Sequence, residues 1–488
     1  MSSHLSTKSR IARRILSSGY QVTPDALDRL TALGEELAAE LVKWLSSRAV
    51  RGSVVDASVI ERFLGERSQR SIPHEEEAVA GHDGVATEEL NLTVLKPTYE
   101  EIRMEGKAEE FTVYRVTRFG ALWRITSQRG LPLRSLREIL ESGDEGYAVC
   151  EVREVSKGDG YYRLRLEDPN GIWTAVASAR DRSLSEKVEG LCSDMVVAVR
   201  VAAKGGRLVV KDVMLPDLPQ SERPFKGPDV RVCVISDVHV GSSRFNRRAF
   251  EDFLSWLSSE HEDLNVRLLL INGDLVDGVF VYPGQREELE IRTLRDQFAE
   301  AGRLLARVPR RVEIAYVPGN HEPVRRALPQ PPVHADHRRL LDPEGRILFL
   351  GNPALIEVGG ARVLLFHGQT MDDVIQSSMR FSYSDLRRTA GEVMEVLLRS
   401  RHLAPSMEVT PVIPWREDHL LLEEVPHVLA TGHIHVAAFR VYRGARLVNS
   451  GTFQDQTKLQ KGVGLEPTVG TVAVLDLRDL SVRFERFA

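Results

Sequence analysis

The stretch Arg231–Gly241, RVCVISDVHVG, decides the fold of the larger part of this 488-residue chain. Its apolar, β-branched first half is typical of a buried strand. The run ends abruptly at Asp237 and His239, and side chains two residues apart at a strand end point to the same face. A carboxylate and an imidazole can therefore share one metal ion, a pairing that suits manganese, iron, nickel or zinc. An aspartate after a strand is, however, more often a loop or helix-cap residue.

Four further apolar runs follow, and each one ends in residue types that bind metals. They are 266–271 before Asn272-Gly273-Asp274, 312–317 before Pro318-Gly319-Asn320-His321-Glu322, 362–366 before His367-Gly368, and 425–430 before Thr431-Gly432-His433-Ile434-His435. In open α/β sheets, ligands gather beyond the carboxyl ends of the strands. Each motif alone is compatible with a turn or a surface histidine, but five in this order favour one shared site.

The order D-x-H, G-D, G-N-H, H-G and G-H-x-H resembles the calcineurin-like metallophosphoesterase superfamily over roughly residues 228–453. The resemblance implies an α/β sandwich that holds two divalent metal ions. The first ion would be held by Asp237, His239, Asp274 and His435. The second ion would be held by Asp274, Asn320, His367 and His433, so that the Asp274 carboxylate bridges the two.

The same resemblance assigns a reaction to this pair of metals. Two metal ions about 3.5–4 Å apart can activate a hydroxide and clamp the attacking and leaving oxygens of an in-line displacement. His321 would be the catalytic histidine of the family, which stabilises the transition state or protonates the leaving oxygen. Glu322 departs from the family pattern, which usually has aspartate here, and the longer side chain puts only fine positioning in question.

The composition describes an ordinary soluble globular protein, with 42% hydrophobic and 28% charged residues. No apolar run of about 18 residues predicts a membrane span, and the N-terminus lacks the apolar core of a secretory signal. Cys150, Cys192 and Cys233 read as reduced core residues, so we expect a cytoplasmic protein. The net charge of −5 gives no general attraction to nucleic acid, so any DNA contact would come from a local basic patch or from the metals.

The length exceeds one hydrophobic core, so several domains are expected. We predict a helical N-terminal domain over 1–65, a polar and acidic flexible linker over 66–88, an OB-fold domain over 89–218 and the phosphoesterase domain over 224–488. The helical part has a good helix start at Thr23-Pro24-Asp25, followed by one leucine stripe from Leu27 to Leu45. It could close its own core or bind a partner.

Residues 89–218 have the texture of short strands separated by hairpin turns. Three strands, a helix and two more strands between 146 and 214 follow the order of an OB-fold, a five-stranded barrel often used on nucleic acids. Tyr161, Tyr162 and Trp173 could stack on bases, although aromatic residues of a small barrel are more often core. The barrel could equally be a platform for protein docking.

The superfamily fold does not determine which substrate is used. The domains that flank the phosphoesterase domain are therefore needed to distinguish among the possible substrates. A helical piece, a linker, an OB-like barrel and a phosphoesterase resemble the B subunits of replicative DNA polymerases. Four stretches are similar to the small subunit of the archaeal D-family DNA polymerase: Gly106–Phe111 with the following TVYRVTRF, 318–331, 414–435 and 450–460.

This resemblance implies a role in DNA replication as a proofreading 3′–5′ exonuclease. The expected cofactors are two divalent metal ions, manganese first, with iron, nickel, zinc or magnesium as alternatives. The expected partners are the large catalytic polymerase subunit and single-stranded or frayed DNA 3′ ends, with no membrane. A stand-alone phosphoesterase that acts on other phosphoesters and a mainly structural scaffold subunit remain as alternatives.

Overall fold

The structure, a computed structural model, describes residues 7–18, 21–48, 54–55, 59–60, 63, 90–96, 102, 104–220, 225–415 and 417–488. The chain divides into two compact units, Met1–Thr87 and Glu88–Ala488. The linker predicted over 66–88 lies outside the described residues. The domain bounds 1–65, 89–218 and 224–488 therefore stay predictions. No helix in the described part of the chain is long and apolar enough to cross a membrane.

Within its described residues, the first unit includes the helices α1 (Thr7–Ser17), α2 (Pro24–Leu33) and α3 (Glu35–Arg48). The predicted helix start is confirmed, because the Thr23 hydroxyl accepts a hydrogen bond from the Ala26 amide at 3.3 Å. The leucine stripe is not one continuous helix, since the backbone at Gly34 has a φ of 99° and ends α2 there. Residues of α1 to α3 form a buried core of their own, including Ile11, Leu30 and Leu41.

Two very short strands of the first unit were not predicted. β1 (Gln21–Val22) pairs in parallel with β2 (Val54–Val55). Strands of two residues carry no periodic signal that a sequence could show.

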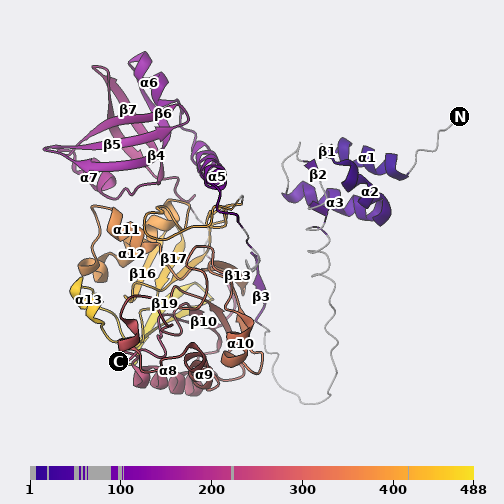
Figure 1. The fold of residues 1–488 in the computed structure, drawn as a ribbon, viewed down its shortest axis with the longest axis vertical. Coiled ribbons are helices and arrows are strands. Elements are labelled where there is room, and N and C mark those ends of the chain that lie inside the picture. The colour runs from indigo at the N-terminus through magenta and orange to yellow at the C-terminus, as the bar shows by residue number, and fades with distance from the viewer. Residues whose placement is uncertain are drawn as a thin grey trace. The chain divides into compact units, whose positions relative to one another are not determined.

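The second unit is built on two six-stranded sheets (Figure 1). The first sheet runs in the order β12 (Ile347–Phe349), β11 (Glu313–Val317), β10 (Val266–Asn272), β9 (Arg231–Ile235), β18 (Thr471–Asp476) and β19 (Ser481–Arg486). The second sheet runs in the order β16 (Ala438–Tyr442), β17 (Ala445–Asn449), β15 (Val428–Thr431), β14 (Ala361–Leu365), β13 (Ala354–Val358) and β3 (Leu92–Val94). The neighbouring pairs β9–β10, β10–β11, β14–β15 and β15–β17 are parallel.

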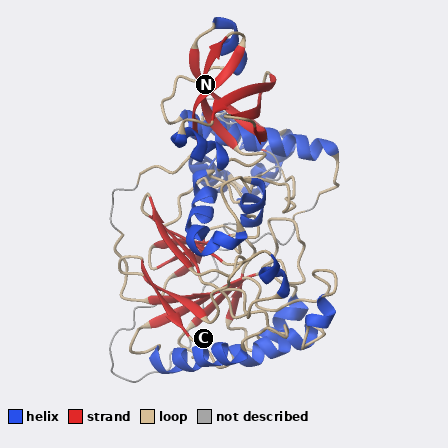
Figure 2. Cartoon of the chain, turned by 90° about the vertical axis from the view of Figure 1, so that its left-hand side faces the viewer, coloured by secondary structure: helices blue, strands red, loops and turns tan. Residues whose placement is uncertain are grey.

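The inner strands β9, β10, β14 and β15 are buried on both faces, which explains their nearly continuous apolar runs. Alternate residues such as Val232 and Val234 pack between the two sheets against Ile356 and Val363. The residues between them in β9 and β10 pack instead with helices α8 (Arg247–Glu260) and α9 (Leu294–Leu305). Helix α12 (Leu386–Arg399) contacts β16 and β17 of the second sheet, so helices lie outside the paired sheets (Figure 2). The predicted α/β sandwich is confirmed.

A closed five-stranded barrel lies earlier in the chain, as predicted. Its strands β4 (Glu145–Lys157), β5 (Tyr161–Asp168), β6 (Gly171–Ser178), β7 (Val196–Lys204) and β8 (Arg207–Met214) close in the order β4-β5-β6-β8-β7, with helix α7 (Arg182–Glu189) between β6 and β7. Tyr162 is a core residue, 1% exposed. The Trp173 indole donates a hydrogen bond to Asp168 and packs on the same core. Only Tyr161 of the three aromatic residues is exposed.

The expectation of strands throughout 89–218 is wrong for its first part. Helices α5 (Ala108–Ser127) and α6 (Leu136–Ser142) precede the barrel. The sequence of α5 is rich in β-branched and aromatic residues, which favour strands as an intrinsic preference. Tertiary packing overrides that preference, because Tyr114, Arg118, Leu122 and Thr126, spaced by four, are all buried. In addition, β3 pairs with β13 and so belongs to the second sheet.

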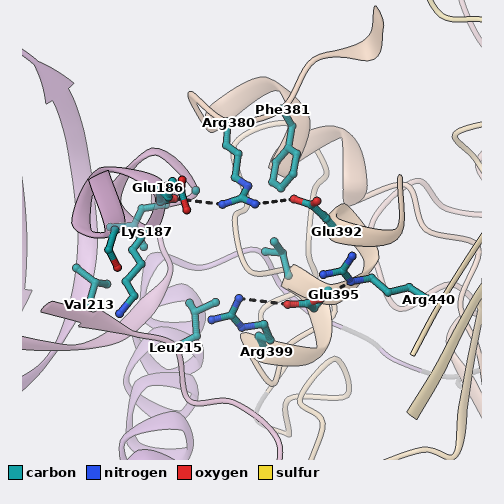
Figure 3. A pocket seen from close by; sticks show the side chains of 14 residues that line it. Glu186, Lys187, Val213, Leu215, Arg380, Phe381, Glu392, Glu395, Arg399 and Arg440 are labelled. Atoms are coloured by element: carbon teal, nitrogen blue, oxygen red, sulfur yellow. Dashed lines mark hydrogen bonds and ion pairs between the residues drawn. The ribbon is translucent and has the colours of Figure 1, made fainter. Parts of the chain in front are cut away.

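The barrel and the sandwich meet at a cavity of about 220 Å³ that is lined by ion pairs (Figure 3). Arg380 lies 2.6 Å from Glu392 and donates a long hydrogen bond of 3.5 Å to the Glu186 carbonyl of α7. Glu395, which is 7% exposed, lies 3.2 Å from Arg399 and 2.5 Å from Arg440. The cations that line this junction thus have acidic partners, and the hydrogen bond from Arg380 to the Glu186 carbonyl links the sandwich to α7 of the barrel.

Candidate metal centre

The predicted site residues come from the carboxyl ends of five strands in the two sheets. Asp237 and His239 follow β9, and Asp274 follows β10. Asn320 and His321 follow β11, His367 follows β14, and His433 and His435 follow β15. The structure brings their side chains into two neighbouring groups that can hold a metal ion, one around Asp237, His239 and His435 and one around Asp274, His367 and His433.

The first group is built around two imidazoles. The Nε2 atoms of His239 and His435 are 3.2 Å apart, and His435 Nε2 is 3.3 Å from Asp237 Oδ1. His239 Nδ1 donates its proton to Asp277 Oδ1 at 2.9 Å, so Nε2 is the atom that faces the site and would offer its lone pair to a metal ion once unprotonated. Asp237 is fully buried, and its Oδ1 accepts no hydrogen bond from the described residues. A cation would satisfy this oxygen.

The second group is a convergence of acceptor atoms. His367 Nδ1 lies 3.0 Å from the Asn272 carbonyl, and because a carbonyl only accepts, Nδ1 carries the proton. The Nε2 atom of His367 then faces Asn320 Oδ1 at 3.0 Å and Asp274 Oδ2 at 3.3 Å. Once His367 Nε2 has lost its proton, the three atoms all offer lone pairs toward one point, which fits a divalent metal ion. The residues present therefore suit the metal centre that the sequence predicts.

The backbone is arranged to bring these side chains together. Five of the residues have a positive φ between 51° and 68°, which non-glycine residues adopt infrequently: Asp237, His239, Asp274, His433 and His435. Such conformations cluster at functional sites. Gly273 has a φ of 90°, and a Cβ there would lie 2.3 Å from His367 Nδ1. A Cβ at Gly319 would lie 2.2 Å from Asp274 Oδ1, so both glycines are required by close packing.

Glu322, the departure from the family pattern, holds two of the loops in place. Its carboxylate accepts hydrogen bonds from the backbone amides of Leu275 and Gly319 at 2.7 Å and of Asp274 at 3.0 Å. Burial and the nearby Asp274 carboxylate raise the pKa of Glu322 to about 7. The longer glutamate side chain thus joins the loop that carries Asp274 to the loop that carries Asn320.

The electrostatics of the site are dominated by the buried carboxylates. Burial lowers the pKa of His367, but the Asp274 carboxylate opposes it and raises the pKa to about 10. The pKa of His321 is lowered, because burial outweighs the attraction of Asp274. His321 Nδ1 donates to the Asp277 carbonyl at 2.7 Å, and its Nε2 lies 4.0 Å from Asp274 Oδ2. His321 is therefore a mainly neutral imidazole whose Nε2 borders the site.

Four further residues orient the candidate ligands, and sequence reasoning missed their roles. They are Asn272, Asp277, Asp372 and Gln460. Asp372 Oδ2 lies 2.9 Å from His433 Nε2, and Gln460 Nε2 lies 2.9 Å from His435 Nδ1. Asp372 lies in the first turn of α11 (Met371–Ser377) and also contacts a candidate ligand.

A two-sheet sandwich with these motifs at its strand ends defines the calcineurin-like phosphoesterase fold class. Comparison with known sequences then supplies the family. Residues 232–441 match the model of the B-subunit family of DNA polymerases alpha and epsilon. The DNA polymerase II small subunit of Archaeoglobus fulgidus is 34% identical over 478 residues, 95% of each chain. That of Methanothermobacter thermautotrophicus is 33% identical over 96% of this chain and 97% of its own.

The chain belongs to the family of DNA polymerase II small subunits, which confirms the resemblance found in the sequence. Among solved structures, an archaeal phosphodiesterase is similar with a TM-score of 0.25 and 12% identity, over 52% of this chain and 99% of its own. Vps29 from Entamoeba histolytica is similar with a TM-score of 0.27 and 15% identity, over 52% of this chain and 97% of its own. The family assignment rests on the sequence relatives.

Proposed function

We propose that this chain is the proofreading subunit of a DNA polymerase, a 3′–5′ exonuclease that hydrolyses phosphodiesters with two divalent metal ions. The observation that carries the proposal is the convergence of acceptor atoms from Asp237, His239, Asp274, Asn320 and His367 at the sheet edge. Membership of the DNA polymerase II small-subunit family supplies the substrate, DNA, and implies a large catalytic subunit as partner.

The proposed ligands are those expected from the sequence: Asp237, His239, Asp274 and His435 for one ion, and Asp274, Asn320, His367 and His433 for the other. Bound divalent ions, with manganese proposed first, would supply Lewis acidity toward the phosphate and lower the pKa of a water molecule. The chain's own contribution is to hold these ligands rigidly. Proton-accepting partners fix the imidazoles of His239 and His367 so that each turns Nε2 toward the site, where a bound metal ion would replace its proton.

His321 is proposed to serve the leaving group. Its Nδ1 proton is fixed on the Asp277 carbonyl, so that proton exchange is confined to Nε2, the atom that borders the site. In the protonated form, His321 would give the Nε2 proton to the departing 3′ oxygen. Its lowered pKa makes that proton easy to release. The products would be nucleoside monophosphates removed one at a time from a frayed 3′ end.

The variant His321→Ala tests this role. We expect it to bind manganese with the affinity of the wild type and to lose nuclease activity by about 100-fold or more, the scale of general acid catalysis. The measurement pairs calorimetric titration of manganese with digestion of a 3′-labelled single strand. His334→Ala is the matched control, because His334 is 71% exposed and caps α10 (Ala335–Leu341). Undiminished digestion by His321→Ala, with metal binding intact, would exclude the role.

A further inference from the structure

The loop 277–284 presents an aromatic side chain to solvent beside the metal centre. Phe280 is 79% exposed, the largest exposed fraction among the large apolar side chains that the structure describes. Its backbone has a φ of 63°, which is a rare conformation for a bulky residue. Burial cannot stabilise this side chain, and its backbone is strained. Strain of this kind clusters at functional sites, where it serves binding or catalysis.

The loop is held firmly against the candidate catalytic histidine. A Cβ on Gly278 would lie 2.2 Å from the His321 carbonyl oxygen, so the two backbones are in direct contact. The ring centroid of Tyr282 lies 6.3 Å from that of His321. Phe280 therefore lies two residues after Gly278 and two residues before Tyr282, the two residues that contact His321.

Two buried glutamines tie this loop to the rest of the sandwich. Gln297 accepts from the Gly278 amide at 2.9 Å and donates to the Gly278 carbonyl at 3.0 Å. Gln285 accepts from the Val281 amide at 2.9 Å and donates to the Asp277 carbonyl at 2.7 Å. Because both glutamines are almost fully buried, the loop is a rigid support for the exposed Phe280.

A second exposed apolar side chain borders the same centre from another segment. Leu459, on the short helix α13 (Lys458–Gly462), is 77% exposed. The next residue, Gln460, lies 2.9 Å from His435 Nδ1. His435 and His239 are themselves 3.2 Å apart at Nε2, and Asp277 at the base of the Phe280 loop holds His239. The two most exposed large apolar side chains of the described residues therefore flank one pair of candidate ligands.

Arg244 provides a cation between the Phe280 loop and the segment that carries Leu459. The Ser243 amide donates to the Glu288 carbonyl beyond the Phe280 loop, and the Asp455 amide donates to the Arg244 carbonyl just before α13. The Arg244 side chain is exposed and forms no ion pair with any residue that the structure describes. Exposed aromatic side chains next to unpaired cations are the combination that binds single-stranded nucleic acid, by stacking on bases and neutralising phosphates.

We propose that Phe280 is a stacking platform for a nucleobase of an unpaired DNA 3′ end, with Leu459 as the opposing apolar wall and Arg244 as a phosphate contact. The inference rests on the proposed exonuclease function and specifies its substrate as a splayed single strand. Val279 and Val281, the neighbours of Phe280, are only half-exposed. With Tyr282, 38% exposed, as the other exposed aromatic residue of the loop, this small surface suits one or two bases better than it suits a protein interface, which needs a broad contiguous surface.

The test uses a single-stranded oligonucleotide with the fluorescent base 2-aminopurine at its 3′ end, whose emission falls on stacking. Binding is measured in a His321→Ala background, so that the probe survives, and digestion is measured with the otherwise wild-type chain. Phe280→Ala should weaken binding on the order of 5- to 100-fold, the range of base–aromatic stacking, and abolish the quenching. Phe280→Tyr should restore both binding and quenching.

Two controls separate stacking from folding. Phe111→Ala removes another exposed phenylalanine, on α5, and should leave binding and quenching unchanged. Phe280→Gly relieves the positive φ, so it should match or exceed the melting temperature of the wild type while binding as poorly as Phe280→Ala.

The outcomes separate this inference from the proposed function. Phe280→Ala that binds and quenches like the wild type, in a chain that digests DNA, overturns the stacking platform and leaves the exonuclease standing. A wild-type chain that neither binds the probe nor digests DNA overturns both. Loss of binding in Phe280→Gly that is accompanied by a lower melting temperature would assign Phe280 a structural role instead.

Discussion

The candidate metal-binding atoms are oriented by a surrounding set of polar side chains. Asp277 fixes the tautomer of His239, and the Asn272 carbonyl fixes that of His367. The chain of hydrogen bonds extends from His433 through Asp372 to Tyr383, because the second Asp372 oxygen accepts the Tyr383 hydroxyl proton at 2.7 Å. Outer partners of this kind raise ligand basicity and hold each ring at the correct angle.

Asp372→Asn tests the importance of this outer set. The neutral amide cannot hold the His433 Nε2 proton as a carboxylate does, so we expect manganese affinity to fall about 10-fold, within the 10- to 100-fold range of such partners. Calorimetric titration of manganese measures the effect. Asp385→Asn is the control, because Asp385 is 43% exposed and pairs with Arg388. Equal affinity of Asp372→Asn and the control would remove Asp372 from the centre.

At the residue scale, the candidate ligands were predictable and their partners were not. Asp237, Asp274 and His367 each follow an apolar run within a few residues, so local pattern reveals them. Asp372 and His433 are 61 residues apart, and no local pattern relates them. A binding role for Phe280 could not be predicted from the sequence either. The inference depends on the exposure and the backbone conformation of this residue, which only the fold defines.

The elements outside the centre are joined by buried polar contacts. The segment after α12 is fixed by His402, whose Nε2 lies 2.9 Å from Asp418 Oδ2 and whose Nδ1 accepts from the Ala404 amide at 2.9 Å. Helix α5 is fixed to the same segment by Arg118, which donates to the Ala404 and Pro405 carbonyls. Contacts of this kind link segments that are distant in the sequence.

The His402 contact predicts a pH-dependent stability. Burial lowers the pKa of His402 in the folded chain below its ordinary value near 6.5. The folded state therefore binds the proton less well than the unfolded state. The contribution of the buried, neutral His402 to the free energy of unfolding is present above a pH of about 6.5. This contribution is lost as the pH falls toward the lowered pKa.

Thermal unfolding between pH 7.5 and pH 5 measures this effect. We expect the melting temperature to fall on acidification, and to fall less in His402→Gln, which keeps a polar side chain but does not titrate. His261→Gln is the control, because His261 accepts no backbone amide proton in the described contacts. Identical pH profiles for the wild type and His402→Gln would show that this contact does not titrate on unfolding.

At the element scale, the strands of the sandwich and barrel were predictable because their periodicity and turns are local. Helix α5 was not, because its buried stripe faces β4, β7 and a distant loop and is diluted by exposed apolar residues such as Val116 and Trp123. The pairing of β3 with β13 across the whole barrel also follows from the tertiary fold alone.

At the scale of the whole molecule, one chain joins a closed barrel to a phosphoesterase sandwich and adds a helical unit before them. The order of these parts could be predicted from the sequence, because each part has its own pattern of apolar and turn residues. The ion pairs at the junction, such as that between Glu395 and Arg440, could not, because they join segments 45 residues apart.

The most direct test of the account is digestion of a primer–template with a 3′ mismatch by the purified chain in manganese. We expect stepwise shortening from the 3′ end that is lost in Asp237→Ala, because that variant removes a buried proposed ligand whose Oδ1 accepts no hydrogen bond from the described residues. The control variant is His334→Ala. Absence of shortening, even with a large polymerase subunit added, or equal shortening by Asp237→Ala, would contradict a metal-dependent proofreading exonuclease.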